Sequence, residues 1–144
     1  MNNNQKAPSR VYIPREMEES IGDIKKEKFF EDAQNKHIYL LALSIGFKNN
    51  KKSKFEKRHE FVRLGTFNEK EKALIKSIAI SDYGGLEILS NKKEVYEISE
   101  KYAATGLKIL KEKVLTSSLG SYEKTIEAEL IRNYDEIEKE IDII

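Results

Sequence analysis

The sequence predicts a mainly α-helical protein, a bundle of about five helices with at most a short strand pair. Charged residues make up 35% of the 144-residue chain and apolar residues 39%, which is typical of helices with ion-rich outer faces. Apolar residues recur at helical spacing along most of the chain. An almost unbroken apolar run, Ile38–Ile45, predicts a central helix enclosed by the others.

Length and composition favour one domain from residue 10 to 144, preceded by a polar, Asn-rich tail at residues 1–9 that we expect to be disordered. The chain contains no cysteine, so it can hold neither a disulfide nor a thiolate metal site. No stretch approaches the roughly 18 consecutive apolar residues of a membrane span, and the first residues lack the apolar core of a signal peptide. We therefore expect a cytoplasmic protein without a membrane contact.

The N-terminal part predicts an extended segment followed by a helix. Val11–Ile13 reads as extended chain, because Ile13 precedes Pro14 and is kept away from helical dihedral angles. Pro14 suits the first position of a helix that continues through Ile24. Glutamates in the first turn of that helix would interact favourably with its dipole.

The central part predicts a buried helix and then a polar connection. Asp32 can cap a second helix, which contains Ile38–Ile45, and Gly46 is a plausible C-terminal stop. A basic loop occupies residues 48–60. Phe61–Leu64 then predicts either a short strand or extended chain.

Two helices in the second half have recognisable N-terminal caps. Asn68 is followed three residues later by Glu71, and Asn91 by Glu94, which is the spacing of a capping box. Gly106 lies inside the second of these helices, where glycine costs about 1 kcal/mol. Its presence indicates close helix packing or a bend.

The last helix, residues 121–144, has the most regular pattern. Its apolar residues are spaced 4, 4, 4, 3, 4 and 3 residues apart, close to a heptad seam, and Asp and Glu fill its other faces. The helix either covers the core of its own domain or docks onto a partner or a second copy. The candidate partner-binding residues are Leu130, Tyr134, Ile137, Ile141 and Ile144.

The net charge of +1 hides an asymmetry between the two ends of the chain. Residues 1–65 carry 14 Lys/Arg against 9 Asp/Glu, residues 66–120 carry 9 against 8, and residues 121–144 carry 3 against 8. Opposite charge at the two ends indicates closure within the chain, a head-to-tail pair, or two different partners.

The basic loop is the feature that points most directly to binding. Five lysines and one arginine lie between positions 48 and 58, interrupted by the aromatic Phe55. Such a surface favours phosphate or an acidic partner, and an aromatic ring among cations can stack on a base or pack on a protein. A lysine-rich loop that only keeps the surface soluble is the simpler alternative. The candidate anion-binding residues are Lys48, Lys51, Lys52, Lys54, Lys57 and Arg58.

The sequence carries no signature of catalysis or metal binding. His37 and His59 are not joined by any ligand spacing, and a zinc site without cysteine would need more histidines. Asp82 and Glu87 flank a Gly-Gly pair, but Leu89 stands where a restriction-type nuclease would need a lysine. We therefore expect a non-enzymatic protein that uses no metal and no cofactor.

Several segments, in order, resemble a known family. They are Val11–Pro14 before a helix, Phe29-Phe30 before a second, Leu40–Phe47 leading into the basic loop, and later Ala79–Leu89 and Tyr102–Leu110. Together they are similar to the fourth accessory protein associated with the Dnd (DNA phosphorothioation) system of bacterial defence loci. The resemblance spans about residues 11–112 and leaves the acidic last helix outside it.

This resemblance implies a helical accessory or adaptor subunit that works beside DNA-modifying or DNA-restricting machinery. Its partners would be other subunits of a defence complex, with DNA as a second candidate for the basic loop and a homo-oligomer as a further one. Two alternatives remain open. Extended Arg10–Ile13 before two helices is similar to ribbon-helix-helix repressors, although Pro14 truncates the strand. An inhibitor from phage or host that acts purely by protein contact is the other alternative.

Overall fold

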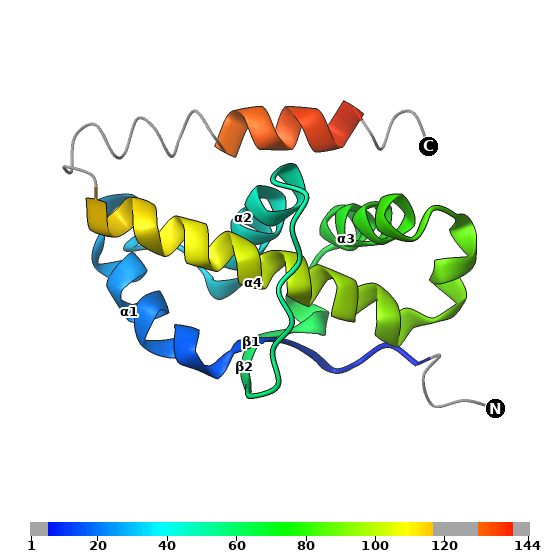
Figure 1. The fold of residues 1–144 in the computed structure, drawn as a ribbon, viewed down its shortest axis with the longest axis horizontal. Coiled ribbons are helices and arrows are strands. Elements are labelled where there is room, and N and C mark those ends of the chain that lie inside the picture. Colours follow the sequence, from blue (N-terminus) through cyan, green and yellow to red (C-terminus); the bar gives the residue numbers. More distant parts are fainter. Residues whose placement is uncertain (1–5, 117–129, 140–144) are drawn as a thin grey trace.

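The computed structural model describes residues 6–116 and 130–139, and within these ranges the chain is mainly helical with one two-stranded sheet (Figure 1). The predicted fold class is therefore confirmed. The elements in order are β1 (Arg10–Pro14), α1 (Glu18–Lys26), α2 (Asn35–Lys48), β2 (Arg58–Arg63), α3 (Glu69–Tyr83), α4 (Lys92–Thr116) and a helical segment at residues 130–139.

The sheet brings the N-terminal segment against the middle of the chain. β1 and β2 run antiparallel, with Val11 opposite Val62 and Pro14 opposite Arg58. Val11 and Val62 are buried, so one face of the sheet closes the core. The extended chain predicted on both sides is confirmed.

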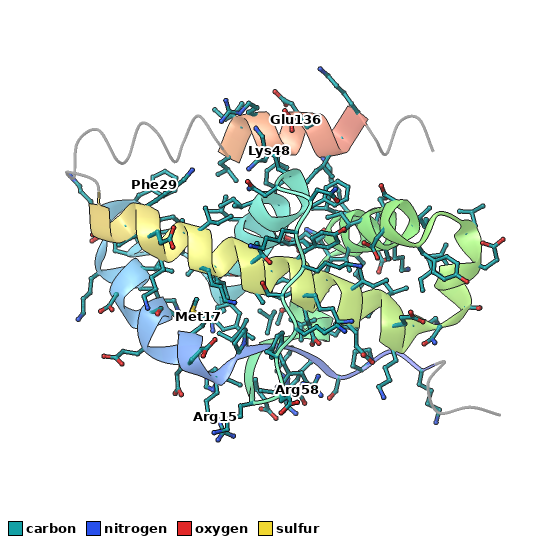
Figure 2. The ribbon with its side chains drawn as sticks, in the orientation of Figure 1. Arg15, Met17, Phe29, Lys48, Arg58 and Glu136 are labelled. Carbon is teal, nitrogen blue, oxygen red and sulfur yellow. The ribbon has the colours of Figure 1, made fainter. Side chains whose placement is uncertain are left out.

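The first helix begins later than predicted. Pro14 is the last residue of β1 rather than the first of a helix, because its pairing with Arg58 keeps it extended with ψ at 136°. A 3₁₀ turn, Arg15–Met17, follows, and α1 begins at Glu18. This turn leaves Arg15 exposed at the corner between strand and helix (Figure 2).

α2 and α4 pack against each other at the centre of the molecule (Figure 1). Nine consecutive residues of α2, from Ile38 to Gly46, are buried, which confirms the predicted central helix. A buried hydrogen bond of 2.6 Å between the hydroxyls of Tyr39 and Ser99 joins the two helices. It satisfies two polar groups that would otherwise be costly in the core.

Two glycines allow this close packing. A Cβ atom added to Gly106 would lie 1.7 Å from the carbonyl oxygen of Ala42, and one added to Gly46 would lie 1.9 Å from that of Tyr102. Backbone atoms therefore meet backbone atoms on both sides of the crossing. The close packing that Gly106 indicated is confirmed.

Both predicted ends of α2 are wrong. Asp32 does not cap the helix. A 3₁₀ turn at Lys28–Phe30 buries Phe30, and α2 begins only at Asn35, with Gln34 as its N-cap. Gly46 does not stop it either, since α2 continues to Lys48. Because Gly46 has no side chain, the backbone of α4 can approach α2 closely at this position.

The two later caps were predicted correctly. Asn68 Oδ1 accepts a hydrogen bond from the Glu71 N–H, and Glu71 Oε1 accepts one from the Asn68 N–H, both at 2.8 Å. Asn91 Oδ1 accepts from the Glu94 N–H at 3.1 Å. These contacts satisfy N–H groups that have no partner inside the helix.

Candidate anion-binding cleft

The six basic residues predicted to act together are divided between two sides of the molecule. Lys48 lies at the end of α2, with its Nζ 3.7 Å from Oε1 of Glu136. Arg58 is the first residue of β2 and lies on the opposite side of α4 from Lys48 (Figure 2). Lys48 thus contacts the acidic C-terminal region of its own chain.

Lys52 is also engaged within the fold. Its Nζ lies 2.9 Å from Oδ1 of Asp82, and the Tyr102 hydroxyl donates a 2.6 Å hydrogen bond to the same carboxylate oxygen. Burial, and then the contact with Asp82, raise the pKa of Tyr102, which keeps its proton for this hydrogen bond. This network ties the basic loop to α3 and α4. Lys51 is exposed and, like Lys48 and Lys52, does not line the cleft described next.

The loop between α2 and β2 crosses α4 and is held there by hydrogen bonds (Figure 1). The Ser53 N–H donates to the Lys101 carbonyl at 3.0 Å, and the Ser53 and Thr105 hydroxyls lie 2.7 Å apart. Further along, the Arg15 N–H donates to the Lys57 carbonyl at 2.9 Å. These contacts bring the loop, the turn after β1 and one face of α4 together.

An open cleft of about 1010 Å³ lies where these three elements meet. Phe55 and four carboxylates, Glu16, Glu56, Glu97 and Glu100, contribute to its lining. Its cations come from all three elements and are Arg15, Lys54, Lys57, Arg58, Lys93 and Lys101.

The cleft has an excess of positive charge that is not neutralised internally. Arg58 pairs with Glu100 at 3.6 Å and Lys93 with Glu97 at 3.9 Å. The remaining carboxylates, on Glu16 and Glu56, are outnumbered by four cations. Among the described residues these four have no ion-pair partner: Arg15, Lys54, Lys57 and Lys101.

A buried carboxylate forms the base of the cleft. Glu100 is only 5% exposed, and its Oε2 accepts a 2.8 Å hydrogen bond from the Tyr12 N–H. Burial raises the pKa of Glu100 to about 7, although the Tyr12 N–H and the Arg58 guanidinium both favour the charged form. Arg58 in turn lies 3.8 Å from the centroid of the Tyr12 ring. Ring and carboxylate together hold the guanidinium in one position.

The structure thus gathers half of the predicted anion-binding residues, Lys54, Lys57 and Arg58, and adds three that were not predicted. Of the additions, Lys93 and Lys101 lie eight residues apart, which places them on one face of α4 beside Glu97. That spacing was visible in the sequence. No sequence pattern indicated that Arg15 would join the cleft, because the position of Arg15 depends on where β1 ends.

The terminal seam packs mainly against the chain's own core. Ile137 is 4% exposed and Leu130 is partly buried against the core, whereas Tyr134 is 36% exposed. Glu138 adds a contact of 3.6 Å to Lys70 of α3. The other two candidate partner-binding residues, Ile141 and Ile144, lie outside the described residues, as does most of the predicted tail at residues 1–9.

Within residues 6–116 and 130–139 no three His, Asp or Glu side chains form a group that could hold a metal ion. Asp82, considered for a nuclease site, is bound to Lys52 and Tyr102. No helix in the described ranges is both long and apolar enough to cross a membrane.

The sequence profile of the family described as DNA sulphur modification system-associated protein 4 matches residues 10–143. The match extends past the span of residues 11–112 expected from the resemblance and includes the helical segment at residues 130–139. The last helix therefore lies inside the family's span, which corrects that expectation. Comparison with curated proteins and with solved structures gives no significant match.

Proposed function

The chain belongs to the DNA sulphur modification system-associated protein 4 family, and we propose that it serves such a system as a non-enzymatic accessory subunit that binds DNA through the basic cleft. The observation that carries this proposal is the group of four unpaired cations lining one cleft, Arg15, Lys54, Lys57 and Lys101. Cations without internal partners can neutralise phosphates, and the release of the counterions condensed on the DNA favours binding.

The family is described as associated with a DNA sulphur modification system, which accords with an accessory role rather than with cleavage of DNA by carboxylate-bound metal ions. The Asp82 carboxylate is held by Lys52 and Tyr102 and serves the fold instead. In this proposal the chain binds and positions DNA, and other subunits of the system carry out the chemical reaction.

A ribbon-helix-helix repressor is a weaker candidate. In such repressors the N-terminal strand pairs with the same strand of a second copy, and the pair enters the major groove. Here β1 pairs with β2 of its own chain. On the strand's other edge, the Tyr12 N–H is bound by the Glu100 carboxylate. The strand is therefore occupied on both sides.

The proposal is tested by measuring binding of a short fluorescein-labelled DNA to the purified chain over a range of salt concentrations. We expect affinity to fall steeply with salt. Changing Lys57 to glutamine should weaken binding and flatten the logarithmic salt slope by about one unit. Lys51→Gln is the matched control, because it removes an exposed charge from the same loop but outside the cleft.

Equal effects of the two substitutions would show that only the general charge of the loop matters. Absence of DNA binding at low salt would refute the proposed function. In that case an acidic protein surface is the remaining ligand for the cleft. Co-purification with other subunits of the modification system, compared between the wild type and Lys57→Gln, would then reveal it.

A further inference from the structure

Phe55 is an aromatic side chain that lies outside the hydrophobic core. It is partly buried and lines the cleft together with Lys54 and Lys57. It is neither a member of the hydrophobic core nor one of the apolar side chains packed against it. Among the described residues it makes no ring contact with another aromatic. The ring is thus available to a ligand that enters the cleft.

The volume of the cleft favours a ligand smaller than a duplex. Its volume of about 1010 Å³ lies at the upper end of the range, roughly 300–1,000 Å³, typical of sites that enclose small molecules. One strand with an unstacked base can enter such a space. A duplex keeps its base faces stacked inside, so it could offer phosphates to the lysines but no base face to the ring.

Two carboxylates of the cleft have no ion-pair partner within the part of the chain that the structure describes, and they also favour a ligand with an exposed base. Glu16 and Glu56 lie among the cations of the cleft and would repel phosphates placed against them. Carboxylates do, however, accept hydrogen bonds from the exocyclic amino groups of bases, such as N4 of cytosine. A lining that mixes cations, two free carboxylates and an aromatic ring matches a nucleotide with an exposed base better than a phosphate backbone alone.

Arg58 adds a cation that contacts within the protein already hold in one position. Its guanidinium lies over the Tyr12 ring at 3.8 Å and beside the Glu100 carboxylate at 3.6 Å. A group held in this way loses little freedom when it binds a phosphate or stacks on a base.

We propose that the cleft binds single-stranded DNA, with one base stacked on Phe55 and the adjoining phosphates on Arg15, Lys54 and Lys57. This inference rests on the proposed function and specifies its ligand. Stacking on an aromatic ring requires a base face that a paired duplex does not expose.

The test compares three fluorescein-labelled DNAs at low salt: a single strand, its duplex, and the same strand without bases. We expect the full chain to bind the single strand most tightly. Phe55→Leu keeps apolar bulk but removes the ring, so it should weaken single-strand binding about tenfold, the effect of losing one stacked base. It should leave duplex and base-free binding unchanged, and Phe55→Trp should restore single-strand binding. An unchanged melting temperature would confirm that the Leu variant is folded.

The outcomes separate this inference from the proposed function. Duplex bound as tightly as the single strand, or a Phe55→Leu variant that weakens all three ligands equally, would overturn the single-strand inference and leave DNA binding intact. Tighter binding of an RNA strand of the same sequence would overturn the assignment to DNA. Binding to none of the three would overturn both. Lys54→Gln should weaken all three, because it removes a phosphate contact.

Discussion

Replacing Gly106 with alanine tests whether the backbone contact between α2 and α4 governs the stability of the fold. The added Cβ would lie 1.7 Å from the carbonyl oxygen of Ala42 and 2.4 Å from its carbonyl carbon. Van der Waals contact would require the helices to separate locally by about 1.5 Å, because neither partner is a side chain that can rotate away.

The expected change in the free energy of unfolding is the difference between the cost of overpacking and the gain in helix propensity. Overpacking costs typically 1–3 kcal/mol and more where the backbone must move. A gap of only about 0.5–1 Å already forfeits a quarter to a half of the dispersion energy of the atoms lining it. Alanine regains about 1 kcal/mol of helix propensity. We therefore expect Gly106→Ala to lower the free energy of unfolding by about 3 kcal/mol, a large part of the 5–15 kcal/mol typical of a domain.

Urea denaturation followed by circular dichroism measures this change. Gly22→Ala is the matched control, because Gly22 lies in α1 with no atom within 4 Å of the added Cβ. It should stabilise the protein by about 0.5–1 kcal/mol. A Gly106→Ala variant as stable as the wild type would refute the proposed closeness of α2 and α4.

Three further predictions concern the core and the base of the cleft. Leu41→Ala, in the buried helix α2, should lose about 2–5 kcal/mol through the cavity it leaves, and an unchanged melting temperature would show that α2 is not central. Ile137→Ala should cost about 2–4 kcal/mol, whereas Ile131→Ala on the same helical segment, where Ile131 is 58% exposed, should stay within about 0.5 kcal/mol. Equal melting temperatures for these two variants would mean that the segment does not cover the core. Glu100→Gln should remove a pH dependence. Burial raises the folded pKa of Glu100 from 4.5 to about 7, so the native state binds the proton more readily than the unfolded chain. Stability is therefore fullest below the unfolded pKa and declines as pH rises through this window to about 7. The Gln variant should gain roughly 3 kcal/mol relative to wild type between those limits in denaturation at several pH values. A difference that does not vary with pH would contradict a carboxylate whose pKa is raised by burial.

The sequence by itself determined the features that depend on neighbours a few residues away. Helical spacing of apolar residues, the Asn68–Glu71 capping box and the burial of Ile38–Ile45 are of this kind. Each can be predicted from residues within a few turns of one another, so a single chain segment carries the whole signal. The strand pair and the close packing at Gly106 were also indicated, because proline and glycine restrict or permit backbone geometry in a way that sequence alone reveals.

Only the tertiary structure decided which charges act together. Lys48 and Lys52 belong to the predicted basic group, yet they contact Glu136 and Asp82, 88 and 30 residues away in the sequence. Lys54 and Lys57 instead line the same cleft as Lys101, which comes from α4. Charges interact through space over several ångströms, and that distance is set by how helices pack rather than by the order of residues. A dense run of lysines therefore predicts a basic segment, while the cleft exists only because the loop, the turn after β1 and α4 meet in the fold.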